Sequence, residues 1–295
     1  MANLIVKPKN GSRKITPFEL TYHLTPWSTF SFVIETKAMV NYGCFRNPSV
    51  AYHQVGERLT VNCLDHSVDA LSVVNYLSGQ AAYPEVYLTT ERNYMFEMEI
   101  VQHYPTAKAI QARLSKDSTA RLIKYCHASG NTITAVIAET FRQPKTKVAI
   151  ATNLRRRLGL PEISTGNLSG GIIFDTHEKV TGQAIQEKLG QDLKDLIRLI
   201  NTNPAQVAKS TLKLNAKILY GGESDYPRLI VSNLGVVNLA WIDGMYFIPP
   251  TVPIENALTI GVVTVNGQLS LVLSSKNLPG LTSEEVINTL EAVCA

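Results

Sequence analysis

The chain has 295 residues, of which 45% are hydrophobic and 18% are charged, and its formal net charge is +4. This composition excludes a disordered chain, and the length predicts two domains or one large two-lobed domain. The positive charge is dispersed except at Arg155-Arg156-Arg157, and no aromatic residues interleave with these arginines. We therefore interpret the run as a solvated face and expect no nucleic-acid partner.

The cysteines and the N-terminus indicate the compartment. Cys44, Cys63, Cys126 and Cys294 form no CxxC or other metal-ligand spacing, which predicts buried free thiols and no metal site. Residues 1–14 have too short an apolar core for a signal peptide. No run of about 18 apolar residues is present, so no membrane span is predicted. By default, these features indicate a cytoplasmic protein.

Strand-like and turn-rich segments alternate in the first third of the chain. Thr16-Pro17-Phe18-Glu19 is typical of a helix start, with a threonine N-cap and a proline at the first helical position. Residues 30–35 and 58–64 predict strands. Residues 68–77 predict a helix, because their apolar residues are spaced three or four apart. Segment 95–100 fits either a strand or a helix.

The rest of the chain predicts an α+β fold. Helices are expected over 115–130, 132–142, 181–200, 204–220 and 286–293, the last one opened by a capping box from Thr282 to Glu285. Strands are expected over 107–114, 147–155, 172–174, 229–233 and 240–248, and Gly235 is expected to stop the strand 229–233. Asn266-Gly267 favours a type I′ turn in a hairpin formed by 258–265 and 268–274. This order predicts mixed or antiparallel sheets flanked by helices.

The stretch Asp65-His66-Ser67-Val68-Asp69-Ala70 stands where a predicted strand gives way to a predicted helix. Many enzymes place a general base and the carboxylate that orients it at such a strand end. However, an isolated histidine is more often structural, and aspartate is favoured at helix starts by capping. These six residues alone therefore leave a catalytic and a structural role open.

Several segments, taken together, resemble the condensation-domain acyltransferase superfamily. This group includes chloramphenicol acetyltransferase, plant BAHD acyltransferases, alcohol acetyltransferases and the condensation domains of nonribosomal peptide synthetases. Residues 65–70 resemble its HxxxDG motif, which follows a strand and opens a helix. Residues 13–19 are similar to the opening helix of the alcohol-acetyltransferase-like members. Residues 115–134 resemble the helix–glycine–helix that begins the second lobe.

The second lobe carries two further similarities. Residues 148–155, followed by Gly166-Asn167, are similar to a strand and a GN segment of the superfamily. Val231-Ser232-Asn233-Leu234-Gly235 resembles the SNxG strand end that lines its channel. Either segment, taken alone, is also typical of an ordinary turn. The resemblance therefore depends on the order of the segments, which extend over nearly the whole chain.

The resemblance implies a chloramphenicol-acetyltransferase-like two-lobed α+β fold, divided into a shortened N-terminal lobe, 1–104, and a C-terminal lobe, 105–295. It implies transfer of an acyl group from a thioester, on coenzyme A or a carrier protein, to an alcohol or amine. The thioester would be a cosubstrate, and no bound cofactor or metal is expected. His66 would be the general base, and Asp69 would support it through an ion pair with Arg13 or Arg155. The residues expected to line the channel are Asp65, Arg155, Asn167, Ser232, Asn233 and Gly235.

The motif departs from the superfamily pattern in two ways. Two residues, not three, separate His66 from Asp69, and Ala70 replaces the glycine. If Asp69 aligns with the motif aspartate, Asp65 occupies the position of the base. An alternative is therefore a catalytically degenerate protein that binds a small molecule or a carrier protein, or shapes a cyclisation. A weaker alternative is an assembly module whose shortened lobe is completed in a homo-oligomer.

Overall fold

The computed structural model describes residues 5–7, 13–14, 30–38, 50–63, 69–78, 85–87, 108–158, 169–191, 226–252, 254–278 and 280–294, and single positions between 203 and 213. Several predicted segments lie outside these residues. They are the helix start at Thr16, the ambiguous segment 95–100, the second half of the helix 181–200 and nearly all of the helix 204–220.

The larger sheet has the strand order β7-β13-β12-β10-β8-β9. Strands β12, β10 and β8 are parallel, and the other pairs are antiparallel. The strands are β7 (Lys108–Arg113), β8 (Val148–Asn153), β9 (Ser169–Phe174), β10 (Leu229–Val237), β12 (Leu258–Val265) and β13 (Gln268–Ser275). This mixed sheet confirms the predicted class.

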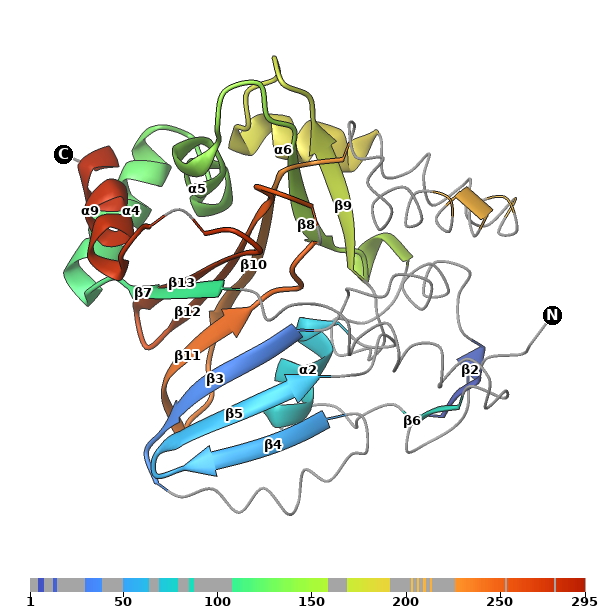
Figure 1. Cartoon of the computed structure of the whole chain (residues 1–295), viewed down its shortest axis with the longest axis vertical. Helices are drawn as coiled ribbons and strands as arrows, with labels where there is room; N and C mark the ends of the chain where they lie inside the picture. Colours follow the sequence, from blue (N-terminus) through green and yellow to red (C-terminus); the bar gives the residue numbers. More distant parts are fainter. Residues whose placement is uncertain are drawn as a thin grey trace.

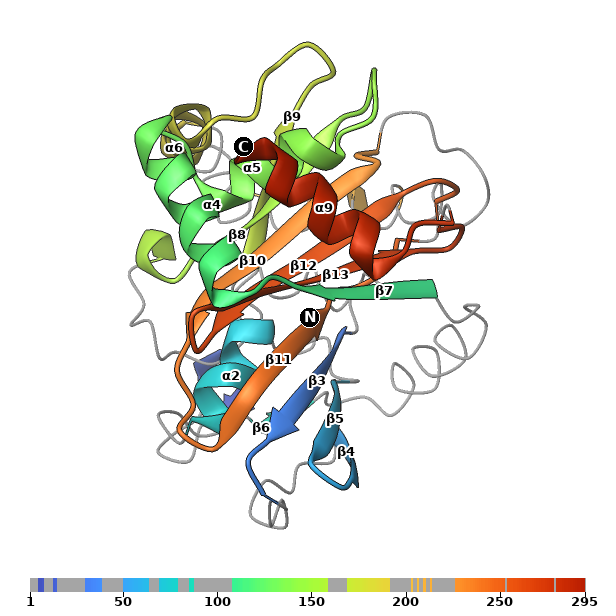
Figure 2. The same cartoon turned by 90° about the vertical axis from the view of Figure 1, so that its left-hand side faces the viewer.

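Helices cover one face of the larger sheet, as Figures 1 and 2 show. They are α4 (Lys116–Ala128), α5 (Ile133–Phe141), α6 (Gly182–Gly190) and α9 (Ser283–Val293). Each begins at a serine or threonine whose hydroxyl accepts a backbone N–H of the first turn, at Ser115, Thr132, Thr181 and Thr282. These caps satisfy donors that a helix start otherwise leaves unpaired. The predicted capping box from Thr282 to Glu285 is present.

The smaller sheet has the order β11-β3-β5-β4, and all its pairs are antiparallel. Its strands are β3 (Phe30–Thr36), β4 (Val50–Val55), β5 (Arg58–Cys63) and β11 (Ile242–Ile248). Helix α2 (Ala70–Leu77) packs against it through Val73, Val74 and Leu77. Three short strands, β1 (Ile5–Lys7), β2 (Arg13–Lys14) and β6 (Glu85–Tyr87), form a separate small sheet.

Strand β11 comes from the second half of the chain and yet completes the sheet of the first half. It pairs with β3 from Ile242↔Thr36 to Ile248↔Ser31 (Figure 1). The two sheets therefore do not correspond to two consecutive stretches of the chain, and the lobe boundary between 104 and 105 stays a prediction. Val263 and Val265 of β12 also pack into the core of the smaller sheet. The two sheets consequently share one apolar interior.

The crossing requires a glycine at position 261. A Cβ built on Gly261 would lie 2.1 Å from the carbonyl oxygen of Phe247 and 2.8 Å from Pro249. The backbone of β11 thus lies directly against β12, which only a residue without a side chain permits.

The hairpin prediction is confirmed, whereas the predicted end of β10 is wrong. Asn266 and Gly267 have φ values of 51° and 77°, as a type I′ turn requires. Gly235 was expected to stop its strand, but β10 continues to Val237. The register with β12 shifts between Asn233 and Val236, and Gly235 takes a φ of 75° there. The glycine therefore accommodates a β-bulge in a strand that continues.

Among the described cysteines, Cys126 and Cys294 are free thiols. Cys63 and Cys126 are buried, and Cys294 is partly exposed. Burial, reinforced by the nearby Cys294, raises the pKa of the Cys126 thiol to about 11, so it is protonated at neutral pH. Cys44 lies outside the described residues. Within the described part of the chain, no helix is long and apolar enough to cross a membrane.

Replacing Gly261 by alanine is expected to lower the free energy of unfolding by about 2 kcal/mol or more, because the new methyl group overlaps the backbone of β11. Urea unfolding followed by circular dichroism measures the change. Gly190→Ala at the end of α6 is the control, because a Cβ there meets no atom within 4 Å. Equal stabilities of the two variants would contradict the close crossing of the strands.

Candidate functional site

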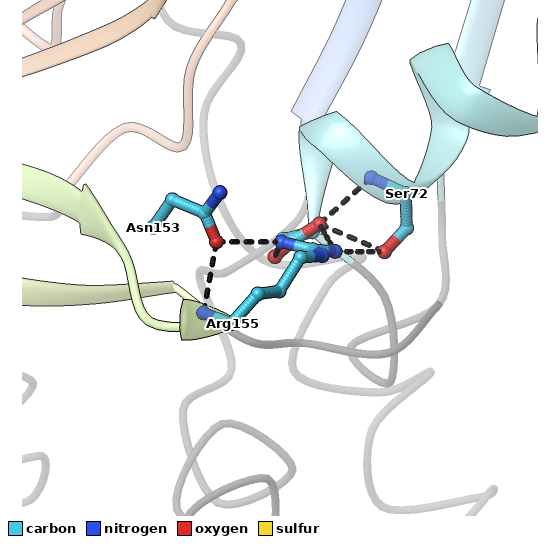
Figure 3. Close-up of polar contacts among 4 residues, drawn as sticks. Ser72, Asn153 and Arg155 are labelled. Carbon is cyan, nitrogen blue, oxygen red and sulfur yellow. Dashed lines mark hydrogen bonds and ion pairs between the residues drawn. The ribbon is translucent and has the colours of Figure 1, made fainter. Parts of the chain in front are cut away.

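A buried ion pair between Asp69 and Arg155 lies at the centre of the candidate site (Figure 3). Arg155 Nη1 donates to Asp69 Oδ2 and Nη2 donates to Oδ1, both at 2.9 Å. The side chain of Arg155 is 0% exposed and that of Asp69 is 6% exposed. This two-pronged geometry is the strongest that the two groups can adopt.

Two neighbouring polar groups complete the network. The Ser72 backbone N–H and hydroxyl both donate to Asp69 Oδ1 at 2.8 Å, and the same hydroxyl accepts from Arg155 Nη2 at 2.7 Å. Asn153 Oδ1 accepts from Arg155 Nη1 at 3.2 Å and from the Arg155 backbone N–H at 3.0 Å. The buried charges are thus both paired and hydrogen-bonded, as burial requires.

Local sequence explains how each partner reaches the pair. Asp69 is the N-cap of α2, so Oδ1 of its carboxylate accepts from the first turn of the helix, while both oxygens also accept from the arginine. Arg155 follows the end of β8, just before the 3-10 helix Arg156–Leu158. The solvated-face interpretation of the three arginines is wrong for Arg155. It holds for the exposed Arg156 and Arg157.

The pair joins the two sheets. Asp69 belongs to the helix that packs on the smaller sheet, and Arg155 extends from a strand of the larger sheet, 86 residues further along the chain. A second ion pair joins β7 to the C-terminal end of β3. Arg113 Nη1 lies 2.6 Å from Glu35 Oε2. The two pairs therefore fix the relative position of the sheets on both sides of their shared core.

A cavity of about 400 Å³ lies beside the Asp69–Arg155 pair. Its volume is within the range of small-molecule sites. The start of α2 and the aromatic residues Phe30 and Phe247 of the smaller sheet form one side. The larger sheet forms the other side of the cavity, with the face that its helices do not cover. Further apolar contacts come from Tyr226, Leu234, Pro249, Pro250 and Val252.

Side-chain alternation in the larger sheet creates the space for this cavity. In β8, Val148 and Ile150 pack under the helices, whereas Ala149 and Ala151 line the cavity. The same alternation places small residues of the neighbouring strands on the cavity side, namely Ser169 and Gly171 of β9, Ser232 of β10 and Thr259 of β12. Large side chains at these positions would fill the space.

The structure brings together four of the predicted site residues. Asp69, Arg155, Ser232 and Asn233 all line the cavity, and Asp69 pairs with Arg155 rather than with Arg13. Gly235 is not among the described lining residues, because it lies in the bulge beyond them.

Three predicted site residues lie outside the described part of the chain. They are His66, Asp65 and Asn167. Asp69, which follows His66 by three residues in the sequence, lines the cavity.

Asn233 has a structural role in addition to lining the cavity. Its Nδ2 donates to Thr134 Oγ1 at 3.0 Å, and its Oδ1 accepts from the Gly235 backbone N–H at 2.8 Å. It therefore ties the bulge of β10 to the start of α5.

Sequence reasoning missed several residues of the site. Ser72 stands three residues after Asp69, which is a capping pattern that could have identified it. The large–small alternation Val148-Ala149-Ile150-Ala151 could have indicated a cavity-facing side of β8. Asn153 carries no such local signal, because its contact with Arg155 depends on the turn after β8.

The cavity offers no free charge from the described residues. Asp69 and Arg155 are the only charged residues among those that line it, and each neutralises the other. Nor do the described residues bring together three or more histidine, cysteine, aspartate or glutamate side chains that would hold a metal ion. From this part of the chain, the site therefore offers apolar contacts and neutral hydrogen-bonding groups.

Comparison with known proteins identifies the fold. No family model matches the sequence, and no curated protein matches it. Polyketide synthase associated protein 5 from Mycobacterium tuberculosis superposes with a TM-score of 0.57 at 10% identity, over 100% of this chain and 98% of that one. The trichothecene 15-O-acetyltransferase of Fusarium sporotrichioides has a TM-score of 0.54 at 11% identity, over 90% of this chain and 70% of the other.

The chain has the chloramphenicol-acetyltransferase-like fold. Part of the nonribosomal peptide synthetase FmoA3 also superposes on the chain, with a TM-score of 0.53 at 13% identity, over 95% of this chain and 42% of that protein. The fold predicted from the resemblance is confirmed. At these identities, the comparisons establish the fold alone, and the activity has to be argued from the site.

Replacing Arg155 by methionine is expected to lower the free energy of unfolding by about 3–5 kcal/mol, because it leaves the buried carboxylate of Asp69 unpaired. Thermal and urea unfolding measure the loss. The double variant Asp69→Leu, Arg155→Met should be more stable than Arg155→Met alone, since both buried charges are removed.

Arg121→Ala is the matched control for this prediction. Its ion pair with Glu291 is 3.5 Å long and the Arg121 side chain is 59% exposed, so its removal should change stability by about 1 kcal/mol or less. A loss in Arg155→Met as small as that in Arg121→Ala would show that the buried pair is not a structural link.

Proposed function

We propose that the protein transfers an acyl group from a thioester to an alcohol or amine. The observation that carries this proposal is the position of the Asp69–Arg155 pair, which lies in the wall of the cavity and holds the start of α2. His66 precedes Asp69 by three residues in the sequence, and Asp69 lines the cavity. The condensation-domain fold supports the proposal as an analogy.

The proposed step begins with His66 as general base. A neutral imidazole nitrogen takes the proton of the acceptor hydroxyl or amine while the acceptor atom attacks the thioester carbonyl. The tetrahedral intermediate then collapses, the C–S bond breaks, and the imidazolium returns the proton to the leaving sulfur. Histidine suits both transfers because its unperturbed pKa of about 6.5 lies near neutral pH.

Asp69 and Arg155 act in this proposal as positioning residues. They pair with each other, and Asp69 also caps α2, so their proposed role is to hold the geometry of the site. Their contribution is to fix the end of the segment that carries His66. Asp65 and Asn167 are proposed to contact the substrate, and Ser232 contributes a hydroxyl to the cavity.

The thioester is proposed to be a cosubstrate carried by coenzyme A or by an acyl carrier protein. Both present the acyl group on a phosphopantetheine arm, which is long and flexible. Such an arm is able to reach a buried site without entry of the whole carrier.

A catalytically degenerate protein is the second candidate, favoured by the spacing of the motif. His66 and Asp69 are separated by two residues where the superfamily motif has three. One residue of displacement turns a side chain by about 100° along a helix and to the other face of a strand. In this case the cavity binds a small molecule or a carrier-borne group, or shapes a cyclisation, without a histidine base.

His66→Ala is expected to lower the rate of acyl transfer at least about 100-fold, because it removes the general base. Release of free coenzyme A from acetyl-coenzyme A is followed with a thiol reagent, in the presence of a set of alcohols and amines. His127→Ala, at the exposed end of α4, is the control and should leave the rate unchanged.

The two candidates give different results in this assay. Acyl transfer that His66→Ala leaves intact would remove the proposed mechanism. Absence of transfer in the parent protein, combined with retained ligand binding, would favour the degenerate protein.

A further inference from the structure

Thr259 carries a buried hydroxyl group beside the cavity. The residue is 2% exposed, and it lines the cavity from the start of β12. The direction of its side chain follows from Gly261, whose Cβ would point at Phe247 of the smaller sheet. Side chains two residues apart in a strand share a face, so the Thr259 side chain also points from the larger sheet toward the smaller one.

The neighbours of Thr259 in the sheet leave this hydroxyl unpaired. Its Oγ1 is buried and has no hydrogen-bond partner among the described residues. The residue opposite in β10 is Ile230, whose large side chain is apolar. The residue opposite in β13 is Ser274, whose hydroxyl is already bonded to Thr251 Oγ1 at 2.7 Å. Neither strand beside Thr259 therefore supplies a partner.

The segment after β11 supplies mainly hydrocarbon to this part of the cavity. Pro249 and Pro250 line the cavity and have no backbone N–H, and Val252 packs with Ile230. A buried hydroxyl without a hydrogen bond costs free energy, whereas valine has the same shape and avoids this cost. Position 259 thus carries a polar atom that the described groups around it leave unpaired, in the wall of a cavity large enough for a small molecule.

We infer that Thr259 determines ligand specificity by donating a hydrogen bond to an oxygen atom of the bound ligand. The ligand class is one with a carbonyl, ether or hydroxyl oxygen at this place in the cavity. Rotation about the Cα–Cβ bond moves Oγ1 between staggered positions, so the hydroxyl can turn toward a ligand without movement of the strand. The inference rests on the proposed function, since it assigns a binding residue to the same site. It concerns binding alone and does not depend on His66.

Two probes with the same ring system test the hydrogen bond. Indanone carries a carbonyl oxygen and indane does not, and their binding to the full chain is measured by calorimetry at neutral pH without a thioester. Thr259→Val keeps the shape of the side chain and removes the hydroxyl. It should weaken binding of indanone about five-fold or more and leave the affinity for indane within about two-fold. Equal changes for the two probes, or no binding of indanone to the parent protein, would overturn the inference.

Thr264→Val is the matched control for binding. It makes the same substitution in the same strand, but Thr264 shares the face of Ile260 and Val262, which pack under the helices, and it is not among the described lining residues. Both affinities should stay within about two-fold of the parent, and a loss for indanone equal to that in Thr259→Val would overturn the assignment. Thr259→Ala covers the case in which Thr259→Val does not fold, and it should lower the ratio of the indanone to the indane affinity by a similar factor.

Thermal unfolding without a ligand gives a second test. Thr259→Val should leave the midpoint unchanged or raise it, because it removes an unpaired hydroxyl. Thr119→Val should lower the midpoint by about 2 °C or more, because the equally buried Thr119 Oγ1 accepts from the Leu269 backbone N–H at 3.0 Å. Equal losses in the two variants would show that the Thr259 hydroxyl is already paired within the protein and would overturn the inference. Because no thioester is present, failure of acyl transfer in the His66 experiment leaves these results intact, and the reverse also holds.

Discussion

The bidentate ion pair between Asp69 and Arg155 is the interaction on which the arrangement of the site depends. A buried charge is stable in a protein only when a partner and hydrogen bonds replace its hydration. Here Ser72 and Asn153 provide the additional bonds, so that four side chains from α2 and the end of β8 form one network (Figure 3). The network fixes the start of α2 against the larger sheet and forms one wall of the cavity.

The cavity exists because the two sheets share an interior without filling it. Strand β11 crosses to the smaller sheet and lies against Gly261, which sets how closely the sheets approach there. Farther along β8 and β9, small side chains face the opposing aromatic residues and leave open space. The same feature, small residues on one face of the larger sheet, therefore permits close backbone contact at one place and a binding cavity at another.

Local features were predictable from the sequence, and long-range features were not. The helix caps and the Asn266-Gly267 turn depend on residues within three positions of each other, and the structure confirms them. The membership of β11 in the smaller sheet depends on contacts about 200 residues apart, which no local pattern contains. Gly235 was misinterpreted because a glycine with positive φ serves equally in a strand end and in a bulge.

The candidate site shows the same division between local and long-range information. The resemblance indicated that Asp69 requires an arginine, but the choice of Arg155 depends on the tertiary fold. A run of three arginines is usually solvated, and only the turn after β8 directs Arg155 inward while Arg156 and Arg157 stay exposed. The existence of the cavity was likewise not predictable from the sequence, because it depends on which sheet faces the small residues of β8.

The most direct test is a crystal structure of the protein with a small aromatic alcohol, benzyl alcohol, bound in the cavity. If the Asp69–Arg155 network holds the His66 segment at the cavity, an imidazole nitrogen of His66 should lie about 3 Å from the alcohol oxygen, or one water molecule away from it. An imidazole that points away from the cavity, with the Asp69–Arg155 pair intact, would contradict the proposed role of His66.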